Sequence, residues 1–191
     1  MMTGSPTNKW DLRYQHAQQP NQPAQVITDN IHLLPSQGHA LELACGLGGN
    51  ALLLAAQGLT VEAWDSSAVA IAKLGSFANH NPSVDPRCID LDQQQPAAAS
   101  YDVICVSAYL DRNICPHIEA ALKPGGLLFY QTFTLERVLE SGPTNPAFLL
   151  QPGELMQLFR GLDTLAYREE SRCGNLQLGL RNQAYLVARK P

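Results

Sequence analysis

Short apolar runs alternate with segments of helical apolar spacing along most of this chain. Strands are predicted at residues 40–44, 60–64, 87–89, 101–106 and 127–131, and helices at residues 23–34, 50–57, 67–79 and 116–122. Regular alternation of strand and helix is typical of a parallel sheet with helices on both faces. The pattern therefore predicts an α/β protein with a doubly wound, mostly parallel sheet.

The C-terminal part of the chain breaks this alternation. A helix at residues 154–159 is followed by two strands, at residues 164–170 and 184–189, that are joined by a loop containing glycine and asparagine. Two strands joined without a helix are expected to pair antiparallel. We find no linker, so we predict a single domain over residues 1–191, in which residues 1–22 form a polar N-terminal segment.

Composition narrows the class of protein and of partner. With 45% hydrophobic and 16% charged residues, the chain is typical of a globular protein. Its net charge of −4 gives no general attraction to nucleic acid or to an anionic membrane, and no apolar run approaches transmembrane length. The five cysteines are scattered and the histidines lack metal-ligand spacing. We therefore expect a cytoplasmic protein without a metal site, a nucleic-acid partner or a membrane partner.

A glycine-rich turn is the most informative local feature. The strand at residues 40–44 breaks at Gly46 and Gly48 and passes directly into a helix, which lets backbone N–H groups approach a ligand closely. Asp65 ends the next strand 19 positions after Gly46, where an acid can bind ribose hydroxyls. This pattern fits NAD and S-adenosylmethionine equally, because both contain an adenosine ribose. Alternatively, Asp65 only caps the helix that begins at Ser67.

Three features favour S-adenosylmethionine over a dinucleotide. Glu42 lies inside the first strand, where it could reach a cationic amino group directly or through water. Asp90 follows the third strand, where its carboxylate could accept a hydrogen bond from the adenine amino group while the Leu91 N–H faces the ring. The predicted antiparallel pair at the C-terminus is not how a simple dinucleotide domain ends.

Successive motifs of the chain resemble those of class I S-adenosylmethionine-dependent methyltransferases, in family order and at family spacing. These motifs are ALELACGLGGN, VEAWD, CIDLD, YDVICVSAYL and LKPGGLLFY. The resemblance implies a Rossmann-like sheet of seven strands with a reversed C-terminal strand, and S-adenosylmethionine as the cofactor. The opening KWDLRY further resembles small bacterial methyltransferases of the tellurite-resistance type.

The resemblance also implies where the cofactor is held. It places the N-terminal helix over the cofactor, where the rings of Trp10 and Tyr14, four positions apart and so on one helix face, could stabilise a sulfonium and Arg13 could pair with the methionyl carboxylate. Alternatively, the two aromatic residues only anchor this helix. The predicted cofactor-binding residues are Trp10, Arg13, Tyr14, Glu42, Ala44, Gly46, Gly48, Asn50, Asp65, Ser66, Asp90, Leu91 and Ser107.

The methyl acceptor is expected at the carboxyl end of the fourth strand, where ligands of such folds bind. Tyr109 could orient the acceptor, Asp111 could accept a proton from it, and Arg112 could hold an anionic group. Alternatively, Asp111 and Arg112 form a pair that positions the following helix. Residues 130–133 could line the acceptor pocket, and the proline-containing segment at residues 143–150 could cover it.

The predicted function is S-adenosylmethionine-dependent methyl transfer to a small cytosolic acceptor by in-line displacement. Such a reaction depends on orientation more than on covalent machinery. The sequence leaves two alternatives open. The first is an NAD(P)-dependent oxidoreductase, and the second is a non-catalytic module that binds S-adenosylmethionine without turnover.

Overall fold

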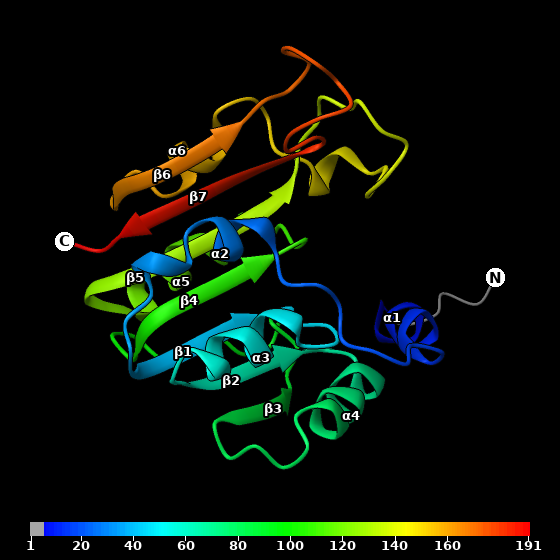
Figure 1. Ribbon diagram of the computed structural model, residues 1–191, viewed down its shortest axis with the longest axis vertical. Coiled ribbons are helices and arrows are strands. Elements are labelled where there is room, and N and C mark those ends of the chain that lie inside the picture. Colours follow the sequence, from blue (N-terminus) through cyan, green and yellow to red (C-terminus); the bar gives the residue numbers. More distant parts are fainter. Residues whose placement is uncertain (1–5) are drawn as a thin grey trace.

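The computed structural model describes residues 6–191, with the backbone alone for residues 6–8. Its core is one seven-stranded sheet (Figure 1). The strands are β1 (Gly38–Leu43), β2 (Leu59–Asp65), β3 (Val84–Cys88), β4 (Tyr101–Ser107), β5 (Leu122–Phe133), β6 (Asp163–Glu169) and β7 (Gln183–Arg189). The helices are α1 (Pro6–Tyr14), α2 (Gln25–Asp29), α3 (Gly49–Ala56), α4 (Ala68–Phe77), α5 (Cys115–Ala121) and α6 (Glu154–Leu158), with 3-10 turns η1 (Ile31–Leu33) and η2 (Pro146–Phe148).

The strand order is β3-β2-β1-β4-β5-β7-β6. All neighbouring pairs from β3 to β5 are parallel, whereas β7 runs antiparallel to both β5 and β6. The predicted fold class, a doubly wound and mostly parallel sheet with a reversed C-terminal strand, is therefore confirmed. Within the described residues, no helix has the length and apolar character needed to cross a membrane.

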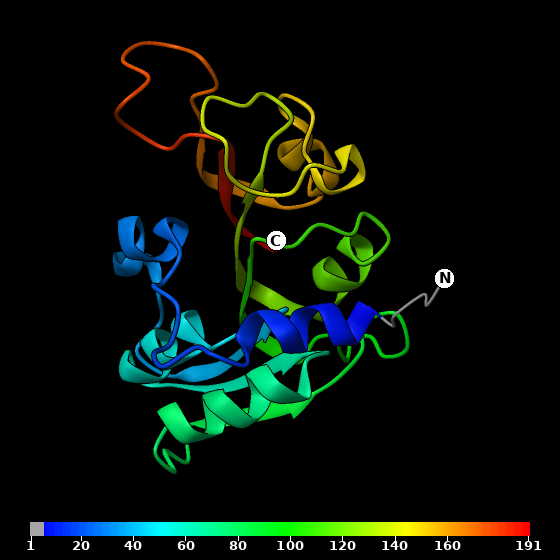
Figure 2. The same cartoon turned by 90° about the vertical axis from the view of Figure 1, so that its right-hand side faces the viewer.

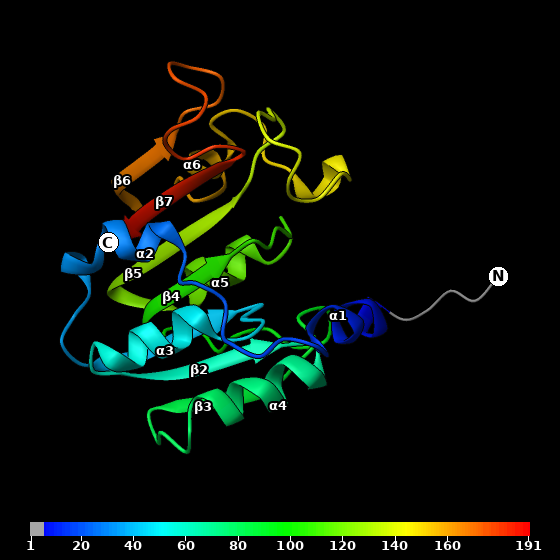
Figure 3. The ribbon, with the colours of Figure 1, turned by 45° about the vertical axis from the view of Figure 1, so that its right-hand side comes forward.

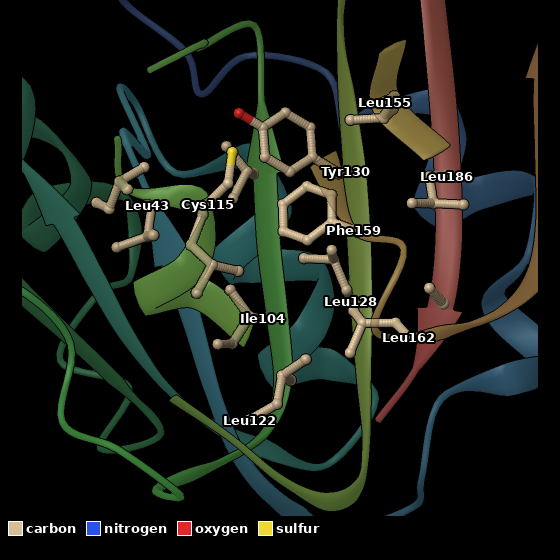
Figure 4. Packing of buried hydrophobic residues seen from close by; sticks show 14 of the residues in the cluster. Leu43, Ile104, Cys115, Leu122, Leu128, Tyr130, Leu155, Phe159, Leu162 and Leu186 are labelled. Carbon is tan, nitrogen blue, oxygen red and sulfur yellow. The ribbon is translucent and has the colours of Figure 1, made fainter. Parts of the chain in front are cut away.

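Each face of the sheet has its own hydrophobic core. Because side chains alternate along a strand, Leu128 and Tyr130 of β5 pack on one face while Leu127 and Phe129 pack on the other. Helices α5 and α6 cover the first face, and α2, α3 and α4 cover the second (Figure 2). Figure 4 shows the first core, where the rings of Tyr130 and Phe159 lie 5.4 Å apart.

Three local differences from the predicted elements have physical causes. The predicted helix at residues 23–34 is interrupted at Asn30, whose side-chain amide donates to the Val26 carbonyl and ends α2. Strand β3 starts before residue 87 and contains Pro86, which an edge strand tolerates because one side of its backbone needs no partner. The predicted turn after α5 lies inside β5, where Gly125 adopts a φ of 78° and the register with β4 shifts.

Candidate functional site

Two alanines in the left-handed backbone conformation mark the carboxyl edge of the sheet. Ala44 follows β1 with a φ of 51°, and Ala108 follows the adjacent strand β4 with a φ of 54°. This conformation costs a non-glycine residue roughly 1–2 kcal/mol, and such residues cluster at functional sites. Both predicted site segments, the glycine turn and the segment after β4, begin at these bends.

The glycine turn is tied to the end of β2 by Asp65. The carboxylate of Asp65 accepts the Gly46 N–H at 2.8 Å on Oδ2 and the Ser67 N–H at 2.8 Å on Oδ1. Asp65 is 8% exposed, and burial raises the pKa of its carboxyl. A carboxylate has about four lone-pair sites, so these two bonds leave acceptor capacity for ligand hydroxyls.

The cap of α4 is Ser67 rather than Asp65. The hydroxyl of Ser67 accepts the Ala70 N–H at 3.1 Å, which is the contact expected of an N-cap side chain. Asp65 accepts the backbone N–H of Ser67 itself and also the N–H of Gly46, so it connects the start of α4 to the glycine turn. The alternative in which Asp65 serves only as the helix cap therefore does not describe its contacts.

Glu42 is fully buried under the first turn of α3. Its Oε1 accepts from Asn50 Nδ2 at 2.7 Å, and its Oε2 accepts the Ala51 N–H at 2.8 Å. Burial raises the pKa of the Glu42 carboxyl to about 8, although these two hydrogen bonds oppose the rise. Both oxygens thus act on the chain itself, holding the helix that follows the glycine turn.

Asn50, in the first turn of α3, connects this helix to β1, to β4 and to the residue before α2. Besides its bond to Glu42, its Nδ2 donates to the Ser107 hydroxyl at 2.9 Å, and its Oδ1 accepts the Ala24 N–H at 2.7 Å. Asn50 is completely buried. The predicted cofactor residues Glu42, Asn50 and Ser107 are therefore brought together, and they form a polar support beneath the glycine turn.

The start of α3 is also covered by the segment that follows α1. Asn21 Oδ1 accepts the Gly49 N–H at 3.3 Å, and a Cβ at Gly49 would lie 1.9 Å from the Asn21 carbonyl oxygen. In dinucleotide-binding folds the pyrophosphate occupies the N–H groups at this helix N-terminus. Here Asn21 and Glu42 bind the Gly49 and Ala51 N–H groups, which disfavours a pyrophosphate at this position.

Helix α1 lies against the glycine turn, next to α4 (Figure 3). A Cβ at Gly46 would be 2.9 Å from the Tyr14 hydroxyl, so only glycine leaves room for this ring. The rings of Trp10 and Tyr14 stack with centroids 6.2 Å apart, which confirms that they share a helix face. The Arg13 guanidinium lies 5.4 Å from the centroid of Trp10, and burial raises the pKa of Tyr14 to about 12.

The predicted adenine-side residues follow β3. Asp90 is exposed, and its Oδ1 accepts the Asp92 N–H at 3.0 Å, which shapes the turn. Leu91 is half-buried and packs against the first hydrophobic core. Ser66 is also half-buried and directly follows Asp65. These residues lie along the same carboxyl edge as the glycine turn, since β2 and β3 are parallel.

On the predicted acceptor side, Tyr109 is half-buried and its carbonyl accepts from the Tyr130 hydroxyl at 3.0 Å. Burial, with a smaller contribution from Asp111, raises the pKa of Tyr109 to about 12. The Asp111 carboxylate accepts the Asn113 N–H at 2.9 Å and so shapes its own turn. Tyr109 can therefore donate a hydrogen bond at neutral pH, while Asp111 organises the backbone before α5.

Arg112 is engaged by the protein itself. Its Nε donates to Glu154 Oε1 at 2.6 Å and its Nη2 to Glu154 Oε2 at 2.9 Å. The same guanidinium donates to the carbonyls of Ala147 at 2.7 Å and Leu149 at 3.0 Å. The partner of Arg112 is thus Glu154 and not Asp111, and the guanidinium fastens residues 147–149 to the segment after β4.

Sequence reasoning missed three residues of this site. Glu154 was visible only as an acid at a helix start, and Asn21 belongs to a polar segment without a pattern. Asp11 accepts from the Ser67 hydroxyl at 2.5 Å, and its signal was its place between Trp10 and Arg13 in the KWDLRY motif. Among the residues that the structure describes, no group of His, Cys, Asp and Glu could hold a metal ion.

Comparison with protein families gives a match over most of the chain. A family described as a methyltransferase domain matches residues 14–166. This span runs from the last residue of α1 to within β6 and includes the glycine turn, Asp65 and the segment after β4. No curated protein matches the chain significantly.

Solved structures share the fold. TehB from Haemophilus influenzae superposes with a TM-score of 0.65 at 22% identity, over 87% of this chain but only 61% of TehB. A putative S-adenosylmethionine-dependent methyltransferase from Listeria monocytogenes gives 0.67 at 16% identity, over 87% and 98% of the two chains. A further such methyltransferase, from Methanosarcina mazei, gives 0.65 at 20% identity, over 89% and 99%.

Proposed function

Because this chain belongs to the methyltransferase domain family, we propose that it transfers the methyl group of S-adenosylmethionine to a small-molecule acceptor. The single observation that carries the proposal is the glycine turn that Asp65 holds at the carboxyl edge of the sheet. Family membership supports methyl transfer as the type of reaction, and the geometry of the turn is compatible with the cofactor of that reaction.

The residues around the glycine turn fit the cofactor. Asp65 keeps acceptor capacity for ribose hydroxyls, and Gly46 leaves room for the Tyr14 ring above the turn. The stacked rings of Trp10 and Tyr14, both on α1, would lie beside the cofactor. Aromatic faces at that place would attract its sulfonium. Asp90 and Leu91 would hold the adenine, with Ser66 beside the ribose.

When bound, S-adenosylmethionine supplies an electrophilic methyl group on sulfur. The residues of the chain contribute orientation and exclusion of water, which together can account for much of the rate of such a transfer. Glu42, Asn50 and Ser107 keep the turn rigid from below. Helix α1 covers the turn from above, and Tyr109 offers a hydrogen bond to the acceptor from the segment after β4.

The residues of the proposed acceptor side favour a methyl acceptor whose nucleophilic atom ionises without a catalytic base. Tyr109 stays protonated at neutral pH because its pKa is raised to about 12, and Arg112 is occupied by Glu154 and two carbonyls. Asp111 shapes its own turn. A thiol or another chalcogen nucleophile needs little base assistance, because its anion is accessible near neutral pH. We therefore propose a small thiol or chalcogen compound as the acceptor class.

The place of action is inferred from the cysteines. All five are free, and Cys88 and Cys173 are exposed, which is typical of a reducing compartment. We propose that the protein acts in the cytoplasm as one domain, on a substrate that the segments after β4 and β5 enclose.

The test is a pair of calorimetric titrations of the purified protein, one with S-adenosylhomocysteine and one with NADH. Binding of S-adenosylhomocysteine alone, with a dissociation constant in the micromolar range or below, would support the proposal. Binding of NADH instead would favour an oxidoreductase, contrary to the contacts of Asn21 and Glu42 at α3. Methyl-transfer assays with thiol, chalcogen and carboxylate acceptors would follow. Tight binding without turnover on any of them would point to a non-catalytic binding module.

A further inference from the structure

Helix α1 is attached to the rest of the protein through the carboxylate of Asp11. Asp11 Oδ1 accepts the Ser67 hydroxyl at 2.5 Å and the Val69 N–H at 3.4 Å. The donors are the N-cap residue of α4 and Val69 in its first turn, so an acid on one helix binds the N-terminus of another. A carboxylate is favoured there because the N–H groups of the first turn carry partial positive charge.

These contacts continue into the glycine turn. Ser67, which donates its hydroxyl to Asp11, donates its backbone N–H to Asp65, and Asp65 accepts the Gly46 N–H. Tyr14 of α1 packs on Gly46 from the other side. The hydrogen bonds thus lead from Gly46 to Asp65, then to Ser67, and then to Asp11 on α1. Because Tyr14 on α1 lies against Gly46, these contacts form a closed ring, which we call the α1 circuit.

Helix α1 needs such an attachment. It has nine residues, and isolated helices shorter than about 12 residues are marginal in water. Its apolar contribution to the core is small, since Leu12 is 59% exposed and Trp10 is 36% exposed. After the helix ends, Lys73 of α4 donates to the Ala17 carbonyl at 2.7 Å, which fixes the following segment on the same helix.

We propose that Asp11 is a positioning residue that holds α1 over the glycine turn and couples the placement of α1 to cofactor binding. Asp11 acts through Ser67 and Asp65 and does not itself touch the reacting atoms. A cofactor ribose on Asp65 would stiffen the α1 circuit, and an attached α1 would in turn hold the cofactor more tightly, since such coupling is reciprocal. The inference rests on the proposed cofactor site.

Three variants of the full chain test the inference. Asp11→Ala removes the acceptor, whereas Asp11→Asn keeps a neutral oxygen that can still accept from Ser67. Asp163→Ala is the matched control, because it removes an aspartate that pairs with Arg189 at the opposite, amino edge of the sheet. The two readouts are the dissociation constant of S-adenosylhomocysteine by calorimetry and the rate of limited trypsin cleavage after Lys9 or Arg13, located by mass spectrometry.

We expect Asp11→Ala to raise the dissociation constant by about fivefold or more and to speed cleavage in α1 by a similar factor. Asp11→Asn should lose less than Asp11→Ala on both readouts, because it keeps the acceptor and removes only the negative charge, and Asp163→Ala should stay close to the wild-type protein. S-adenosylhomocysteine should slow cleavage of the wild-type α1 and protect Asp11→Ala less.

Each other outcome is informative. An unchanged cleavage rate in Asp11→Ala would overturn the attachment of α1, and faster cleavage with unchanged affinity would overturn the coupling. Equal losses in Asp11→Asn and Asp11→Ala would show that the hydrogen-bond acceptor is not what matters. If the wild-type protein bound no S-adenosylhomocysteine, the proposed function would fail and the coupling with it, whereas the cleavage rates would still decide whether Asp11 holds α1.

Discussion

Arg112 and Glu154 form a bidentate ion pair, with Nε to Oε1 at 2.6 Å and Nη2 to Oε2 at 2.9 Å. The pair joins the segment after β4 to the start of α6 on the same face of the sheet. Since Arg112 also binds the carbonyls of Ala147 and Leu149, it fixes the chain that leads from η2 into α6. An arginine that was predicted to hold an anionic acceptor thus binds residues of its own chain instead.

Replacing Arg112 should therefore cost stability more than cofactor affinity. Arg112→Ala leaves Glu154 and two carbonyls without their donor, which should lower the free energy of unfolding by about 1–2 kcal/mol in urea titrations. The dissociation constant of S-adenosylhomocysteine should stay within about twofold, because Arg112 makes no contact with the glycine turn. Arg189→Ala, which breaks an exposed pair with Asp163, should cost less than about 1 kcal/mol. Equal losses in the two variants would contradict the role of Arg112.

Asp65 should control cofactor affinity. Asp65→Ala removes the proposed acceptor for the ribose hydroxyls and releases the Gly46 N–H, so the dissociation constant of S-adenosylhomocysteine should rise more than about tenfold. Calorimetry measures this change directly. Asp102→Ala is a suitable control, because that aspartate pairs with Lys123 away from the carboxyl edge. An affinity unaffected by Asp65→Ala would remove Asp65 from the binding site.

The sheet and the glycine turn could be predicted because both depend on local sequence. Apolar periodicity predicts the strands, and the sequence separation of Gly46 and Asp65 predicts an acid beside the turn. The structure shows that Asp65 also holds the backbone of the turn. The interruption at Asn30 of the helix predicted at residues 23–34 was not predictable from apolar spacing, which continues through it.

The pairing of long side chains could not be predicted. Asp11 meets Ser67 across 56 positions, and Arg112 meets Glu154 across 42. Such partners are chosen by how helices and loops pack in three dimensions, and no local period encodes that choice. From the sequence, Arg112 could be predicted to bind an anionic acceptor, whereas in the structure it binds the carboxylate of Glu154.

Glu42 should make the protein less stable as pH rises. Burial raises the pKa of its carboxyl from 4.5 to about 8, so between these values the folded state keeps a proton that the unfolded state has released. The free energy of unfolding should fall across this window, by on the order of a few kcal/mol, and level off above it.

The variant Glu42→Gln isolates this effect, because glutamine resembles the protonated carboxyl and cannot lose a proton. Urea titrations at about pH 5 and about pH 9 should show a smaller loss of stability with rising pH in Glu42→Gln than in the wild-type protein. Nearby Asp65 is present in both proteins, so its own titration contributes to both stability curves. Parallel stability curves for the two proteins would mean that Glu42 is already ionised in the folded state.

The contact between Gly46 and Tyr14 can be tested by a double-mutant cycle. Gly46→Ala places a Cβ 2.9 Å from the Tyr14 hydroxyl on a backbone with a φ of 52°, so both a clash and backbone strain are introduced. The strain alone should cost about 1 kcal/mol. The clash should add to it, because α1 must shift away from the turn.

Tyr14→Phe should relieve the clash but not the strain. Without the hydroxyl oxygen, the nearest atom of residue 14 would be Cζ at 3.4 Å, an ordinary contact. The double variant should therefore lose less stability and less affinity for S-adenosylhomocysteine than the two single losses predict. Gly75→Ala serves as the control, since a Cβ in that part of α4 meets no atom within 4 Å and should be neutral or mildly stabilising. Additive losses in the cycle would mean that the Tyr14 hydroxyl does not rest on the glycine turn, and the α1 circuit would then be open at that point.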